Sequence, residues 1–165
     1  MNQREKDLIL SLAQKKISID DFAREYGVNF LDNKRQILMM LNDAFNSKDS
    51  EEVEYSMLLG FHLNAFSPEY APLLCKLLLA DWHYKHEDIV FILQKLKNPN
   101  TVDCLYDVIF AKFSYLEYDD SYSLARKAIH ALADIDTNEA RAMLQRLSNS
   151  DIPIIREKAK KQLKY

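Results

Sequence analysis

Glycine is scarce in this chain of 165 residues, which contains only Gly27 and Gly60. Tight β-hairpins usually need glycine or asparagine at positive φ, so this scarcity argues against a β-rich fold. It also excludes the glycine-rich loop that wraps a bound phosphate, because that loop needs several glycines within a few residues. The composition therefore predicts an all-α protein.

Long apolar stretches are also absent, since no segment approaches the ~20 uninterrupted apolar residues that a membrane helix needs. Residues 1–7 alternate in charge and lack the apolar core of a signal peptide. We therefore expect a cytoplasmic protein that makes no contact with a membrane.

Cysteine occurs twice, as Cys75 and Cys104, and both residues lie in apolar segments with helical spacing. The sequence leaves a disulfide between them possible, but it favours buried free thiols, because disulfides are rare in the cytoplasm. Apolar surroundings disfavour a thiolate. We therefore predict that both cysteines are reduced and unreactive.

An excess of basic charge is missing as well, because the formal net charge is −3. A strongly basic surface is the usual mark of nucleic-acid binding, so this function becomes the alternative rather than the main hypothesis. A basic cluster near the end of the chain, on one predicted helix, is expected to face solvent: Lys158, Lys160, Lys161 and Lys164.

A spacing of 31 residues recurs in two parts of the chain. In the middle, Pro68, Leu74, Leu77 and Leu78 correspond to Pro99, Leu105, Val108 and Ile109. Nearer the end, Asp120, Ala128 and Leu132 correspond to Asp151, Ala159 and Leu163. Such self-similarity is typical of helical repeat proteins, because one helix pair cannot bury its apolar stripe without a neighbour.

The segment from Asp151 to Arg156, followed by Ala159 and Leu163, resembles the start of a HEAT repeat of the short bacterial type. This resemblance implies an α-solenoid of stacked HEAT-like helix pairs over residues 49–165. Residues 1–48 do not follow the repeat, and we expect them to form a helical cap at its N-terminal end. In that cap, Ser18 should begin a helix that Gly27 ends, and Asp32 or Asn33 should begin the next. The whole chain, 1–165, is then a single domain.

His83 and His86 are spaced as His-x-x-His, with Asp81 and Asp88 beside them. Two histidines and a carboxylate can bind zinc, and a metal-dependent enzyme is the least favoured alternative. A polar loop between helices explains the same residues, and no nucleophile has a motif around it. We therefore expect no metal, no cofactor and no catalytic residue.

Tyrosines and acids gather where the repeat is interrupted, near residues 112–120. Tyrosine is enriched at protein interfaces, and an acidic face suits a basic partner. Acids of the preceding helix and aromatic residues of the preceding loop are expected to share this surface. The candidate partner-binding residues are Trp82, Tyr84, Asp103, Asp107, Tyr115, Glu117, Tyr118, Asp119, Asp120 and Tyr122.

The main hypothesis is a non-enzymatic scaffold that binds a protein partner, and we expect this partner to be basic because its charge would complement the acidic face. Small acidic proteins with HEAT-like repeats resemble the immunity proteins of bacterial toxin systems, and many of those toxins are basic nucleases. The resemblance therefore implies an immunity protein that neutralises a basic toxin. A nucleic-acid-binding HEAT-repeat protein is the alternative.

Overall fold

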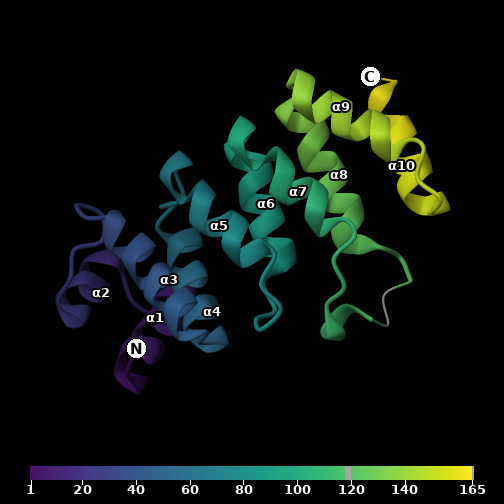
Figure 1. The fold of residues 1–165 in the computed structure, drawn as a ribbon. Coiled ribbons are helices and arrows are strands. Elements are labelled where there is room, and N and C mark those ends of the chain that lie inside the picture. The colour runs from purple at the N-terminus through teal and green to yellow at the C-terminus, as the bar shows by residue number, and fades with distance from the viewer. Residues whose placement is uncertain (118–119, 165) are drawn as a thin grey trace. The chain divides into compact units, whose positions relative to one another are not determined.

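The computed structural model describes residues 1–117 and 120–164, and these residues form helices and turns but no strand (Figure 1). Within this part of the chain there are ten α-helices and three short 3-10 turns. The prediction of an all-α fold is confirmed. No helix of the described residues has the length and apolar character needed to cross a membrane.

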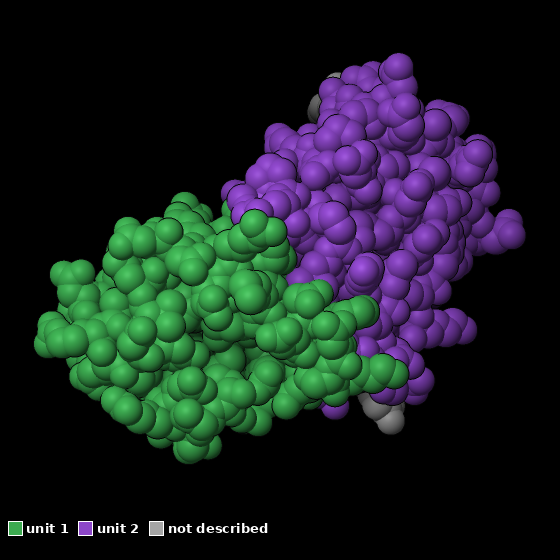
Figure 2. Space-filling model, turned by 60° about the vertical axis from the view of Figure 1, so that its left-hand side comes forward, with its two compact units in different colours: residues 1–66 green, residues 67–165 purple. Residues whose placement is uncertain are grey.

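The chain divides into two compact units, residues 1–66 and residues 67–165, which Figure 2 shows in green and purple. Unit 1 contains α1 (Gln3–Ala13), α2 (Ile19–Tyr26), α3 (Arg35–Ser47) and α4 (Ser50–His62). Unit 2 contains η1 (Pro68–Tyr70), α5 (Ala71–Leu78), α6 (His86–Leu96), η2 (Pro99–Thr101), α7 (Val102–Val108), η3 (Ser114–Leu116), α8 (Ser123–Ile135), α9 (Asn138–Leu147) and α10 (Pro153–Leu163). The expected boundary of the N-terminal cap, after residue 48, falls inside unit 1, where α3 packs against α4.

Local capping signals set most helix ends in unit 1. The Ser18 side chain accepts a hydrogen bond from the Asp21 N–H and begins α2, and Gly27 ends that helix at φ 82°. Both ends agree with the sequence prediction. The start of α3 was placed wrongly at Asp32 or Asn33, because the helix begins at Arg35 and has no side-chain cap.

One buried hydroxyl in unit 1 has no hydrogen-bond partner among the residues that the structure describes. Ser56 is fully buried in α4, and its Oγ is unpaired. We expect Ser56→Ala to raise the free energy of unfolding by about 1 kcal/mol, because alanine removes a polar group that burial has taken from water. Urea denaturation would measure the change. Ser148→Ala is the matched control, since the buried Ser148 hydroxyl donates to the Gln145 carbonyl at 2.7 Å and its loss should be destabilising. A loss of stability in Ser56→Ala would contradict the prediction.

The 31-residue spacing has a structural counterpart in unit 2. Pro68 and Pro99 each begin a 3-10 turn that leads directly into a helix, α5 or α7. Buried residues occupy the matching positions of the two helices, including Leu74 and Leu105. Ala128 of α8 and Ala159 of α10 are both fully buried as well. The repeat therefore recurs in secondary structure and in the burial of these positions, although Leu163 is exposed where its counterpart Leu132 is buried, and the stacking of its pairs into a solenoid stays a prediction.

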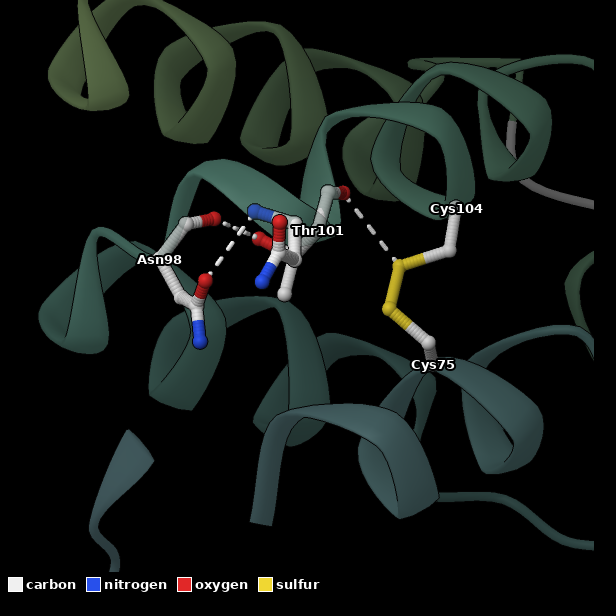
Figure 3. Close-up of a disulfide and its surroundings, with 5 residues drawn as sticks. Cys75, Asn98, Thr101 and Cys104 are labelled. Atoms are coloured by element: carbon white, nitrogen blue, oxygen red, sulfur yellow. Dashed lines mark hydrogen bonds between the residues drawn. A yellow bond between two sulfur atoms is a disulfide. The ribbon is translucent and has the colours of Figure 1, made fainter. Parts of the chain in front are cut away.

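The two cysteines form a disulfide, so the prediction of reduced thiols was wrong. Cys75 of α5 is bonded to Cys104 of α7, and their Cα atoms are 5.5 Å apart (Figure 3). The Sγ of Cys104 also lies 3.3 Å from the Thr101 carbonyl oxygen. The apolar faces that suggested two separate buried thiols face each other, because α5 packs against α7.

Helices in this chain often end at a residue other than glycine in the left-handed region. Lys48, Lys97 and Asp136 follow α3, α6 and α8 at φ 54°, 49° and 54°. An L-residue in this region is less stable than glycine by roughly 1–2 kcal/mol before differences in chain entropy are counted. The scarcity of glycine thus leaves local strain at several helix ends.

Candidate functional site

A cavity of about 650 Å³ lies in unit 2, where the end of α7, the η3 segment and the start of α8 meet. Such a volume is within the range of ligand pockets. The residues that line it are Val108, Ile109, Phe110, Ala111, Lys112, Phe113, Leu116, Glu117, Asp120, Tyr122, Ser123, Leu124, Ala125 and Ile152. We call this cavity the α7–α8 pocket.

The α7–α8 pocket has an apolar interior and a polar rim. Buried apolar side chains from α7, the η3 segment and α8 form its interior, including Val108, Phe113 and Leu124. Its exposed polar residues are Lys112, Glu117, Asp120 and Tyr122. An apolar interior with a few polar groups around it is the usual composition of a binding site.

Tyr122 holds a strained position at this rim. It immediately precedes α8 with φ 53° and ψ 41°, and its side chain is 39% exposed. A bulky residue in the left-handed region is an outlier that the surrounding structure must enforce, and such residues cluster at functional sites. Here the Tyr122 carbonyl accepts the first hydrogen bond of α8, from the Arg126 N–H at 2.9 Å. This hydrogen bond holds Tyr122 at the start of α8, where the residue lines the pocket.

An exposed stripe of α7 leads to the pocket. Asp103 and Asp107 are exposed and one helical turn apart, as the sequence predicted. Phe110, just beyond the helix, is 46% exposed and lines the pocket. Residues spaced in this way lie on one side of a helix. The acids and the apolar entrance to the pocket therefore belong to the same side of α7.

The two histidines of the His-x-x-His pair are both fully buried. The Nε2 of His83 donates to the Leu77 carbonyl at 2.7 Å, and the Nε2 of His86 donates to the Ala80 carbonyl at the same distance. Leu77 lies in the last turn of α5, and its carbonyl also accepts from the Ala80 N–H at 3.0 Å, while Ala80 lies two residues beyond the end of that helix. The histidines thus bind carbonyls at and just beyond the end of α5. His83 lies in the loop between α5 and α6, as expected, and His86 begins α6, but the burial of both was not predicted.

The remaining nitrogen of each ring accepts a hydrogen bond. The Nδ1 of His83 accepts from the Lys85 N–H at 3.0 Å, and the Nδ1 of His86 accepts from the Tyr115 hydroxyl at 2.7 Å. Each ring therefore uses one nitrogen as a donor and one as an acceptor, which defines a neutral imidazole. We call His83, His86 and Tyr115 the histidine clasp.

Burial keeps the histidine clasp uncharged. Burial lowers the pKa of His83, and it lowers the pKa of His86 to about 4, with a further lowering by His83. Burial also raises the pKa of Tyr115 to about 12. In the described part of the chain, no group of three His, Cys, Asp or Glu side chains is arranged to hold a metal ion. The occupied ring nitrogens argue further against zinc at His83 and His86.

Ring stacking joins the histidine clasp to the pocket. The ring centroids of His83 and His86 are 4.3 Å apart, and those of His86 and Phe113 are 3.7 Å apart. Phe113 also lines the α7–α8 pocket. The start of α6 therefore supports the η3 segment, which forms one wall of the pocket.

The structure places the predicted partner-binding residues in three neighbourhoods rather than in one. The α7–α8 pocket contains Glu117, Asp120 and Tyr122. Around the histidine clasp lie Trp82, Tyr84 and Tyr115. Asp103 and Asp107 lie on the exposed stripe of α7. Tyr118 and Asp119 lie outside the described residues.

Sequence reasoning missed the apolar part of the site. Phe110 and Phe113 line the pocket although neither was singled out, and the signal available was only their place after a predicted helix. The role of the histidines had a clearer signal, because polar side chains just beyond a helix often pair with its last carbonyls. Comparison of the chain with models of protein families, with curated proteins and with solved structures found no match.

Proposed function

We propose that unit 2 is a non-enzymatic module that binds a basic protein partner through the α7–α8 pocket and the exposed stripe of α7. The pocket carries this proposal, since it combines an apolar interior, a rim with carboxylates and a strained tyrosine. Interfaces concentrate their affinity in pockets that hold an anchoring side chain. An arginine or lysine of the partner suits this pocket, because its apolar stem would contact the interior while its charge stays near the rim.

Charge supports a basic partner. The described exposed carboxylates of α7 and of the pocket rim are Asp103, Asp107, Glu117 and Asp120. Lys112 is the exposed cation that lines the same pocket. Complementary charge accelerates encounter between partners and disfavours wrong ones.

The proposal extends to the HEAT-like arrangement, with the helix pairs stacked as a solenoid. The two proline-led turns before α5 and α7 and the buried alanines of α8 and α10 support it. An immunity protein that neutralises a basic toxin is the specific role that this arrangement and the acidic surface suit best.

The location of the protein enters the proposal through the disulfide. The sequence predicted the cytoplasm, where thiols are normally kept reduced. The bond between Cys75 and Cys104 favours an oxidising compartment instead. A cytoplasmic location therefore stays a prediction that this bond opposes.

Tyr122→Gly should weaken binding without weakening the fold. We expect about a tenfold loss of affinity, or ~1.4 kcal/mol, because an aromatic side chain at the pocket is removed. The free energy of unfolding should not fall, because glycine adopts the left-handed region without the strain of tyrosine. Binding kinetics with a basic protein recovered from the native host would measure the first effect, and urea denaturation the second.

Lys97→Gly is the matched control, because Lys97 is also left-handed at a helix end but does not line the pocket. It should relieve comparable strain and leave the affinity unchanged.

Association with a basic partner should also slow as salt is added, since surface charge is screened over ~8 Å at physiological ionic strength. Recovery of a protein from the native host does not by itself support the proposal; the affinity of that protein must also fall in Tyr122→Gly. Equal affinity of the parent and Tyr122→Gly would place the contact elsewhere.

A further inference from the structure

The wall of the α7–α8 pocket depends on a buried hydrogen bond that a proton can break. Tyr115 lies in η3, between Phe113 and Leu116, which both line the pocket. Its hydroxyl donates to the Nδ1 of His86 at 2.7 Å, while the centroid of the His86 ring lies 3.7 Å from that of the Phe113 ring. The η3 segment is therefore attached to the start of α6 through a group that can accept a proton.

We propose that the histidine clasp is a proton-sensitive latch that holds the pocket wall in place and releases it on acidification. A proton from solvent would occupy the Nδ1 of His86, which then has no lone pair for the Tyr115 hydroxyl. The hydroxyl loses its acceptor, and the imidazolium is left in a buried stack of aromatic rings. The latch itself is a property of this chain, and only its effect on a partner rests on the proposed function.

The surroundings of the clasp determine the direction of this response. In the loop after α5, Asp81 favours the charged form of His86 through space, whereas the stacked His83 opposes it. On α6, the charges of Glu87 and Asp88 raise the pKa of Tyr115. The Nζ of Lys85, the residue just before α6, lies 3.8 Å from the Oδ2 of Asp88. On the η3 side, Tyr115 is neutral, since burial raises its pKa to about 12. Burial outweighs both the hydrogen bond to the Ala80 carbonyl and the attraction of Asp81, and it keeps His86 neutral in the closed clasp.

The pH range of the latch follows from linkage. The pKa of His86 in the closed clasp is about 4, whereas a solvated histidine has its pKa near 6.5. The open clasp therefore binds a proton more readily than the closed one. The closed form has its full stability above about pH 6.5 and loses it progressively as the pH falls toward 4. Opening should occur within this range.

NMR of the protein alone would test the latch. We expect the amide signals of residues 113–117 to shift between pH 7.5 and pH 4.5 with the same midpoint as the His86 ring signals. Amide signals of α1 should keep their folded positions through this step. Amides 113–117 that do not shift with His86 would overturn the latch, and so would global unfolding in the same step.

Two variants separate the latch from a general effect of pH. Tyr115→Phe keeps the ring but removes the donor, so the shift at residues 113–117 that follows His86 should be lost. His130→Gln is the matched control, because His130 lies on α8 outside the clasp and is only partly buried. Its spectra should show the same response as the parent. A response that disappears in His130→Gln, or persists in Tyr115→Phe, would overturn the latch.

Binding of the recovered basic partner distinguishes failure of the latch from failure of the proposed function. With both correct, the parent binds more weakly at pH 5 than at pH 7.5, and Tyr115→Phe loses most of this difference. If the amides respond but Tyr122→Gly binds as well as the parent, the latch holds and the proposed function fails. If Tyr122→Gly loses affinity while the amides do not respond, the latch is overturned.

Discussion

Replacing Ala128 with glutamate is expected to lower the free energy of unfolding by about 4 kcal/mol or more. Ala128 is fully buried in α8, the helix that packs against α6, α7, α9 and α10. A glutamate at this position would need space that the neighbouring helices occupy, and its charge would be buried without a partner. Circular dichroism during urea denaturation would measure the loss.

Ala142→Glu is the control for Ala128→Glu. Ala142 is an exposed alanine of α9, so the same substitution changes helix propensity and charge without burial. Surface substitutions of this kind usually change stability by about 0.5 kcal/mol or less. Equal stability of the two variants would contradict the packing of α8 described above.

Loss of the Cys75–Cys104 disulfide should lower the free energy of unfolding by about 3–4 kcal/mol. The bond closes a segment with a sequence separation of 29, and opening it gives the unfolded chain more conformations. Its stabilising effect is therefore largely a restriction of the unfolded state. Denaturation in guanidinium chloride, with and without a strong reductant, would measure this difference.

The double variant Cys75→Ala with Cys104→Ala is the control for reduction. It should have close to the stability of the reduced parent, and adding reductant to it should change nothing. If the parent unfolds at the same denaturant concentration in both conditions, the disulfide does not contribute to stability.

Local features of the sequence predicted both ends of α2. Ser18 and Gly27 act through hydrogen bonds and dihedral angles within a few residues, so their effects can be inferred without a tertiary structure. Where such a signal was absent, as at Arg35, the predicted helix start was wrong by two or three residues.

Contacts between distant segments could not be inferred in the same way. The apolar spacing around Cys75 and Cys104 identified buried helix faces but not which helix each face contacts, so the disulfide was missed. The burial of His83 and His86 depends on the end of α5 and on Tyr115.

The candidate site was predicted in part for the same reason. Exposure of Asp103 and Asp107 follows from helical periodicity, and the structure agrees with it. The α7–α8 pocket is formed by residues from the segments 108–117 and 120–125 together with Ile152, which precedes α10. A cavity made by segments with different directions leaves no periodic signal, so its apolar residues could not be identified in advance.

The disulfide also determines how the chain would transmit a pulling force. The Cα atoms of Cys75 and Cys104 are 5.5 Å apart, although a separation of 29 residues could extend to roughly 100 Å. Tension applied beyond the two cysteines would pass through the sulfur–sulfur bond and bypass α6 and η2. Those segments would stay unloaded while the neighbouring helices are pulled apart, and they could add to the extension only after reduction.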